Sequence, residues 1–360
     1  MKKILALILA GCMVLSMAAC GGSETAAPTE ENTATTEETK EEAPAEKAEE
    51  TAEEVAAEVP AGGKVGVCIY KFDDAFMTTY RNALQAILEE KGYEVSVVDG
   101  NNDQAKQTEQ VNTFITQGVD ALIINPVMTS AADTIIAAVK QANIPTVLIN
   151  REPTAEQMAA YDKLVYVGCD AAQSGTFQGE IILETENKGD INGDGKVSYI
   201  MIQGDPENVD AQYRTEFSVK ALTDAGMEVE ELLKQRGDWD QARAQQIAQD
   251  ALNQYGDKIE VIFCNNDAMA LGALQAIEAA GRKVNEDIYL VGVDALTEAV
   301  QNVIDGKQTG TVFNNHFAQA QAASDIAVKF LSGEKVDAVN MVNYEKVTQD
   351  NAQEILDMLK

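Results

Sequence analysis

Short apolar runs rich in β-branched residues alternate with longer helical patterns along most of this chain. Four of these runs are KVGVCIY (64–70), ALIINP (121–126), IPTVLIN (144–150) and IEVIFCNND (259–267). Apolar runs without polar alternation predict strands that are buried on both faces, as in a parallel sheet covered by helices on both sides. The β–α units are too many for one small sheet, so we predict an α/β chain with two doubly wound lobes.

Ligands of open α/β sheets bind beyond the carboxyl ends of the strands, so the residues that follow each predicted strand form the candidate site. They are mostly Asp and Asn, which together can donate and accept hydrogen bonds. The candidates are Tyr70, Asp74, Phe76, Asn125, Asp210, Arg214, Asn266, Asp267, Asp294 and Asn314. Such a set suits the hydroxyl groups of a sugar, and an ionised Asp or Arg makes the stronger, charge-assisted bonds.

The single tryptophan, Trp239, lies in RGDWDQA, between a predicted strand and a predicted helix. A lone Trp is often a packing residue. In a loop between two Asp residues it could equally stack on the C–H face of a pyranose, and the sequence leaves both interpretations open.

Charge and motif content exclude several functions. Residues 61–360 carry 46 acidic and 23 basic side chains, which would repel the phosphates of a nucleic acid. Glycine-rich phosphate-binding motifs are absent. The chain has one His, His316, so HExxH zinc chemistry is excluded and a Ser–His–Asp triad would depend on that residue alone. Cys68, Cys169 and Cys264 have no metal-ligand spacing, and we expect them to be small buried side chains.

The N-terminal segment differs from the rest in composition. Residues 1–19 hold a short basic start, an apolar stretch that is short for a membrane-spanning helix, and small residues before Cys20. This is the pattern of a bacterial lipoprotein signal peptide, so we expect Cys20 to be acylated and to anchor the chain to the outer face of the cell membrane. Residues 20–61 are rich in Glu, Ala, Thr and Pro and lack aromatic residues, which predicts an acidic, disordered tether.

The segment DINGDGKVS reads like the start of an EF-hand calcium loop. Asp190, Asn192 and Asp194 occupy positions 1, 3 and 5, and Gly195 occupies the sharp turn at position 6. Position 12, where the motif needs a bidentate Glu, is Met201. Either the segment is a polar Asx–Gly turn without a metal, or the missing carboxylate comes from another part of the chain.

In chain order these segments resemble the bacterial galactose/glucose-binding proteins of sugar ABC transporters, which have the type I periplasmic-binding fold. The resemblance covers nearly the whole chain from about Lys64 onward. Its motifs are IYKFDDAFM (69–77), NNDQAKQ (101–107), INPV (124–127), NREP (150–153), YDKLVYVGCD (161–170), DINGDGKV (190–197), DPENVDAQYRTE (205–216), WD (239–240), IEVIFCNNDAMALGA (259–273), GVDAL (292–296) and GTVFN (310–314).

The resemblance implies two lobes, joined by a three-strand hinge, that close on one sugar. The N-terminal lobe would comprise residues 62–147 and about 316–347. The C-terminal lobe would comprise residues 148–315 and about 348–360 and would carry the calcium loop. A ligand shifts such an open–closed equilibrium only through its higher affinity for the closed form.

The family's site residues carry over position by position. Phe76 and Trp239 would sandwich the pyranose ring, and Tyr70 would lie at the rim. The sugar's hydroxyls would be bound by Asp74, Asn125, Asn208, Asp210, Arg214, Asn266, Asp294 and Asn314. In the family, the Asp that matches Asp74 accepts the 4-hydroxyl in either epimeric position, which permits both D-glucose and D-galactose. Asn208 stands where the family has a His, and this departure leaves the preferred hexose open.

The resemblance also implies where the missing carboxylate of the calcium loop comes from, because in the family the bidentate Glu comes from a distant strand. The matching residue here is Glu260. The implied structural Ca²⁺ ligands are Asp190, Asn192, Asp194, the Lys196 carbonyl, Ser198 and Glu260. Ser198 stands where the family often has a longer Gln, and a water could bridge the gap.

The resemblance implies a monomeric, non-enzymatic protein that delivers its sugar to an ABC transporter permease and meets the membrane only through its lipid. Three alternatives remain. The ligand could be another monosaccharide, or the loaded protein could signal to a chemoreceptor or a sensor kinase. Asp74 and Asp210 could also act as glycosidase carboxylates, although the sequence gives no evidence on their separation.

Overall fold

The computed structural model describes residues 62–360, and the predicted signal peptide, Cys20 and the tether lie outside that range. Within it the α/β prediction is confirmed, because the strands form two parallel sheets and one antiparallel pair. We call each parallel sheet with its helices a lobe, N-terminal or C-terminal. In the described part of the chain, no helix combines the length and the apolar character that crossing a membrane requires.

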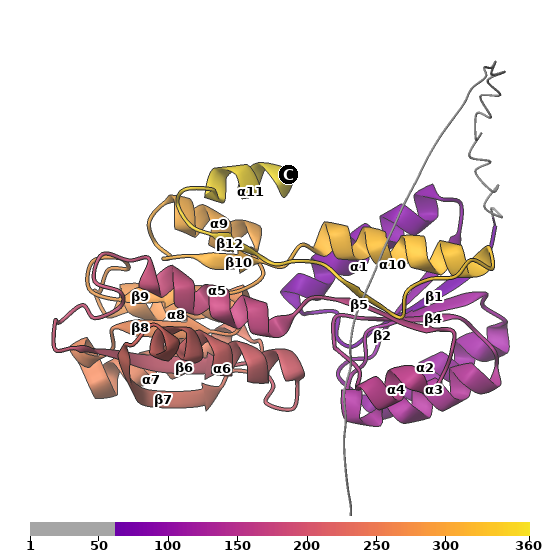
Figure 1. Cartoon of the computed structure of the whole chain (residues 1–360), viewed down its shortest axis with the longest axis horizontal. Helices are drawn as coiled ribbons and strands as arrows, with labels where there is room; N and C mark the ends of the chain where they lie inside the picture. Colours follow the sequence, from indigo (N-terminus) through magenta and orange to yellow (C-terminus); the bar gives the residue numbers. More distant parts are fainter. Residues whose placement is uncertain (1–61) are drawn as a thin grey trace, which may run out of the picture. The chain divides into compact units, whose positions relative to one another are not determined.

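The N-terminal lobe is a six-stranded parallel sheet with helices on both faces (Figure 1). In sheet order its strands are β11 (Val339–Met341), β5 (Leu164–Gly168), β4 (Thr146–Ile149), β3 (Ala121–Ile124), β1 (Lys64–Ile69) and β2 (Glu94–Asp99). One face is covered by α1 (Ala75–Glu90) and α10 (His316–Leu331). The other is covered by α2 (Gln104–Gln117), α3 (Ala132–Gln141) and α4 (Ala155–Ala159), with the 3-10 turn η1 (Thr129–Ala131) before α3.

The strand sequences explain this two-sided burial. Val65, Val67 and Ile69 of β1 pack toward α1 and α10, whereas Cys68 packs toward α2 and α3. Successive side chains of a strand point to opposite faces, so a continuous apolar run serves both layers. The expected burial of the cysteines is confirmed, since Cys68, Cys169 and Cys264 are all buried and unpaired.

The C-terminal lobe repeats this layering around a four-stranded parallel sheet. Its strands are, in sheet order, β7 (Glu228–Arg236), β6 (Lys196–Gln203), β8 (Val261–Cys264) and β9 (Tyr289–Val291). One face packs on α5 (Ala171–Leu183) and α6 (Val209–Asp224), and the other on α7 (Gln241–Tyr255) and α8 (Asp267–Ala279), with η2 (Gly256–Lys258) after α7. A smaller core joins α9 (Thr297–Ile304), α11 (Ala352–Met358) and the antiparallel pair β10 (Thr311–Phe313) and β12 (Glu345–Val347).

The chain crosses between the lobes three times, after β5, after β10 and after β11. The predicted first boundary, between residues 147 and 148, needs correction, because β5 pairs with β4 in the N-terminal sheet and the crossover therefore follows Gly168. The predicted last boundary at about 347 also moves, because β12 pairs with β10 and the crossover follows Met341. The continuous apolar run of β5 would suit either sheet, so its sequence does not reveal its partner.

Candidate functional site

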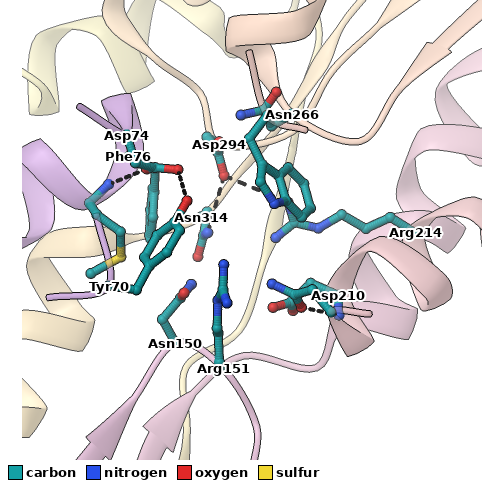
Figure 2. A pocket seen from close by; sticks show the side chains of 13 residues that line it. Tyr70, Asp74, Phe76, Asn150, Arg151, Asp210, Arg214, Asn266, Asp294 and Asn314 are labelled. Atoms are coloured by element: carbon teal, nitrogen blue, oxygen red, sulfur yellow. Dashed lines mark hydrogen bonds and ion pairs between the residues drawn. The ribbon is translucent and has the colours of Figure 1, made fainter. Parts of the chain in front are cut away.

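Side chains from both lobes line a pocket at the carboxyl ends of the parallel strands (Figure 2). The lining residues are Tyr70, Asp74, Phe76, Met77, Asn150, Arg151, Asn208, Asp210, Arg214, Trp239, Asn266, Asp294 and Asn314. The structure thus brings together the candidate site residues that the sequence predicted, except Asn125 and the strand-end candidate Asp267. Met77, Asn150 and Arg151 were not predicted.

Three of the lining side chains cap the helices that begin at the pocket. Asp74 Oδ1 accepts the N–H of Met77 at 2.7 Å, Asn208 Oδ1 that of Asp210 at 2.8 Å, and Asn266 Oδ1 that of Met269 at 3.0 Å. An N-cap satisfies a helix amide that would otherwise lack a partner, so each cap fixes its own side chain. Each also keeps a second polar atom that can face a ligand.

Asp74 is joined to the aromatic side of the pocket. Its Oδ2 accepts the hydroxyl of Tyr70 at 2.6 Å, and burial raises the pKa of that phenol, so the tyrosine keeps its proton and donates. Phe76 lies in the first turn of α1 with 5% of its surface exposed. His316 packs edge-on against the Phe76 ring at 6.3 Å, and burial lowers the pKa of this His to about 4.

Asn125 lies behind the pocket rather than in it. It is fully buried, and its Nδ2 donates to Asn150 Oδ1 at 3.1 Å and to the Ile149 carbonyl at 3.2 Å. Its Oδ1 accepts the backbone N–H of Tyr70 at 3.4 Å. Asn125 therefore holds Asn150, which does line the pocket, and the direct ligand contact predicted for Asn125 needs correction.

Arg151 adds a second guanidinium group to the pocket. It lies 4.0 Å above the ring of Tyr70 and donates to the carbonyl of Val127, and its Nε is buried without a partner. A desolvated guanidinium over an aromatic face is held by cation–π attraction. Asn150 and Arg151 follow β4, so the strand-end rule that found the other residues covers them too.

Arg214 is held from three directions. Its Nη1 donates to the Asn265 carbonyl at 2.8 Å and lies 3.9 Å from Asp294 Oδ1, and its Nη2 donates to the Tyr344 hydroxyl at 3.0 Å. Its Nε is buried without a partner. Burial raises the pKa of Asp210, and the guanidinium groups of Arg214 and Arg151 oppose that rise. Charge from both lobes therefore acts on this carboxylate.

Asp294 and Asn314 line the part of the pocket next to Arg214. Asn314 Nδ2 donates to Asp294 Oδ1 at 3.2 Å, while its Oδ1 accepts from Gln319 Nε2 at 2.7 Å. Burial raises the pKa of Asp294 well above its usual range, opposed by Arg214. Figure 2 shows Asp294, Asn314 and Arg151 pointing into the same space.

Trp239 both packs and lines the pocket, so the two interpretations of this residue are compatible. Its indole packs against the C-terminal core and lies 5.8 Å from the guanidinium carbon of Arg214. Asp238 and Trp239 both have positive φ, at 57° and 63°, which turns the loop sharply. A Cβ on Gly204 would lie 2.3 Å from the indole, so this glycine makes room for the ring.

The predicted calcium loop lies at the start of β6, and Glu260 reaches it from the residue before β8. Glu260 is 1% exposed, and its two oxygens accept the N–H groups of Asn192 at 2.9 Å and Ser198 at 2.8 Å. Burial raises the pKa of Glu260, and these amide bonds oppose the rise. The two parts of the split motif therefore meet in space.

The loop's own amides use most of its side-chain oxygens. Asp190 accepts from Gly193 and Gly195, and Asp194 accepts from Lys196. Within residues 62–360 no set of three or more His, Cys, Asp or Glu side chains is arranged to hold a metal ion. The donor types still fit Ca²⁺, which takes carboxylate, amide and carbonyl oxygens. Asp190 Oδ1 already accepts two amides, from Gly193 and Asp194, whereas Asp190 Oδ2 accepts one and keeps a second acceptor direction.

Residues 65–335 match the family model described as a periplasmic binding protein domain. The D-galactose/methyl-galactoside binding periplasmic protein of Haemophilus influenzae is 36% identical over 312 residues, which cover 82% of this chain and 92% of that protein. A putative rhizopine-binding protein of Rhizobium meliloti is 31% identical over 292 residues, 81% of this chain and 91% of that protein.

A solved structure is also similar. The crystal structure of an ABC transporter solute binding protein from Bacillus halodurans with bound myo-inositol superimposes with a TM-score of 0.73 and is 30% identical. The match covers 82% of this chain and 98% of that one.

Proposed function

This chain belongs to the periplasmic binding protein family, and on that basis we propose that it binds a monosaccharide outside the cytoplasm and delivers it to an ABC transporter. One observation carries the proposal. The pocket joins paired donors and acceptors from both lobes with the aromatic side chains of Phe76 and Trp239. Hydroxyls need donors and acceptors together, and the C–H faces of a sugar ring need apolar surface.

D-galactose or D-glucose is the ligand that we favour. Asp74 offers a fixed carboxylate that can accept from either epimer at the 4-hydroxyl, and a relative named for D-galactose is 36% identical to this chain over 312 residues. Asn208 uses its oxygen to cap α6, which leaves its amide N–H₂ for the sugar. Asn150 and Arg151 extend the proposed set of contacts.

Calorimetry of residues 21–360 against D-galactose, D-glucose, D-ribose and myo-inositol tests both the class and the choice of ligand. We expect saturable heat with one of the two hexoses, at a higher affinity than for the pentose. The absence of heat with every hexose would contradict the proposal for D-galactose or D-glucose. Turnover of aryl glycosides that an Asp210→Asn variant abolishes would instead favour the hydrolase alternative.

A cyclitol is the second candidate, because a structure 30% identical to this chain holds myo-inositol. An inositol has a full ring of hydroxyls but lacks a ring oxygen and an exocyclic CH₂OH group. Competition of myo-inositol against D-galactose in the same cell separates the two. Whether the loaded protein also signals to a chemoreceptor or a sensor kinase is a further question, which deletion of the chain in living cells would answer.

We also propose that the 190–198 loop binds a structural Ca²⁺ with the help of Glu260. The donor types support it, as does the position of a buried carboxylate beside the loop. When bound, the ion would add a crosslink between two segments of one lobe. Added chelator should lower the melting temperature and added Ca²⁺ should restore it. A melting curve that is indifferent to both would contradict the site.

The lipid anchor at Cys20 is a separate proposal, supported by the sequence pattern alone. A Cys20→Ser variant should be released into the medium or the soluble fraction, whereas the parent chain should fractionate with membranes. Equal fractionation of the two would contradict acylation.

A further inference from the structure

Asp267 is a buried carboxylate beside the pocket that does not line it. It follows Asn266 in the first turn of α8 and has no exposed surface. Both oxygens accept from Thr311 Oγ1, at 2.8 and 2.9 Å, and Oδ1 also accepts from Gln308 Nε2 at 3.2 Å. Oδ2 accepts the backbone N–H of Leu296 at 2.9 Å. Four contacts thus converge on one side chain.

These contacts join the three segments that supply one side of the pocket. Asn266 precedes Asp267 directly, Asp294 lies two residues before Leu296, and Asn314 lies three residues after Thr311. The segments come from the start of α8, the turn after β9 and the strand β10. Asp267 is therefore the common anchor of three lining side chains that are distant in sequence.

The turn after β9 needs such an anchor. Asp294 and Ala295 have φ values of 120° and 55°, a backbone conformation that residues other than glycine rarely adopt. The N–H of Leu296 is held by Asp267, and the N–H of Ala295 donates to Thr311 Oγ1 at 3.4 Å. A Cβ on Gly292, the residue after β9, would lie 2.0 Å from Asp267 Oδ1, so a glycine at this position leaves room for the carboxylate.

We propose that Asp267 is a positioning residue that fixes Asn266, Asp294 and Asn314 for the ligand without touching it. Loss of its carboxylate leaves buried donors on Thr311 and Leu296 without an acceptor, and the strained turn loses its support. The consequence for affinity rests on the proposed function, whereas the consequence for the turn does not.

Two variants test this role. Asp267→Asn keeps the shape but replaces one acceptor oxygen with a donor, and Thr311→Val keeps the volume but removes the hydroxyl. In the ligand-free chain we expect faster hydrogen exchange in the peptide that contains Leu296, more in the first variant than in the second. For the preferred sugar we expect Asp267→Asn to weaken binding by about tenfold or more, the effect of losing a hydrogen bond to a charged group.

Ile277→Val is the matched control, because Ile277 is buried on the same helix and packs in the core behind it. It should lower the melting temperature yet leave the affinity and the Leu296 exchange unchanged. Combining the two test variants should give less than the sum of their effects, since both act on one contact.

The outcomes separate this inference from the proposed function. If the parent chain binds no monosaccharide or cyclitol, the proposed function fails, while the exchange measurement still decides whether Asp267 holds the turn. Unchanged exchange in a folded Asp267→Asn or Thr311→Val chain overturns the inference. Faster exchange with an affinity within about twofold of the parent also overturns it, because the turn would then not matter to the ligand.

Discussion

The pocket and the 190–198 loop use the same residue types but differ in what their oxygens bind. In the loop, Asp190 and Asp194 accept amides from within the next five residues. In the pocket, Asp74 and Asn266 each give one oxygen to a helix. The second oxygen of Asp74 accepts the Tyr70 hydroxyl, and the amide nitrogen of Asn266 remains for a ligand. The pocket also joins segments from both lobes, whereas the loop needs only Glu260 from outside.

Because of this difference, we expect the pocket to determine the affinity for the ligand and the loop to contribute mainly to the stability of the fold. A loop that satisfies its own oxygens contributes mainly to holding one lobe together. A pocket whose polar atoms remain available contributes to ligand binding, and its geometry depends on contacts far apart in the chain. Variants of the pocket should therefore change affinity more than melting temperature, and variants of the loop should do the reverse.

Acid gives the largest expected effect, through His316 behind Phe76. Burial lowers the pKa of His316 from 6.5 to about 4, so between those values the unfolded chain binds a proton that the folded chain does not. Stability should fall as pH drops from about 6.5 to about 4, by up to about 3 kcal/mol. Chemical unfolding at a series of pH values measures this loss.

A His316→Phe variant serves as the control for the acid prediction. It keeps an aromatic ring against Phe76 and should lack this component of the acid loss. In the metal-free chain, Glu260 at the loop works in the opposite direction, because burial raises its pKa and its protonation on acidification favours the folded state. An identical acid profile in the parent and the variant would show that His316 is not protonated on unfolding.

Removal of the Trp239 indole has the second-largest expected effect, a loss of affinity for the sugar. For Trp239→Ala we expect a loss of about thirtyfold in affinity, near 2 kcal/mol, the range of an aromatic hot spot. The ligand-induced fluorescence change should disappear with the only Trp. Gly204→Ala should also weaken binding, because its Cβ would displace the ring. Unchanged calorimetric affinity in Trp239→Ala would remove this residue from the site.

The sequence predicted the layered α/β fold because periodicity reports which faces of an element are buried. The first lobe boundary that the resemblance implied, between residues 147 and 148, falls inside β4 and before β5. The sequence of β5 could not correct it, because a strand buried on both faces suits either sheet. The pairing of β5 with β4 is a long-range choice that only the whole assembly decides.

The sequence also located most of the pocket, because the ends of parallel strands meet at one edge. It could not distinguish Asn125 from Asn150, two amides at neighbouring strand ends of which one holds the other. Arg151 follows β4 and could have been found by the same rule. Met77 falls on the buried face of α1 and carries no signal of a pocket.

Glu260→Gln should affect stability while sparing affinity. The change removes the charge and turns one acceptor oxygen into a donor that faces an amide, at a cost of about 1–2 kcal/mol in the free energy of unfolding. The response of the melting temperature to chelator and Ca²⁺ should vanish as well. Glu228→Gln is the matched control, because it removes the same charge from an exposed side chain. Glu228 Oε1 lies 3.9 Å from Lys196 Nζ. A loss of sugar affinity in Glu260→Gln would break the proposed division between the two regions.

Asn208→His should have the smallest effect, a change of less than about tenfold in the ratio of the galactose and glucose affinities. The imidazole reaches further than the amide and titrates near neutral pH, so the ratio should depend on pH between 6 and 8. The variant loses the cap on the Asp210 N–H, which costs about 1 kcal/mol of stability. Asn208→Asp keeps that cap and separates its loss from the change in reach. Asn208→His could abolish binding while Asn208→Asp does not. That result would show that the position of α6, which carries Asp210 and Arg214, determines sugar recognition more than the side chain at 208 does.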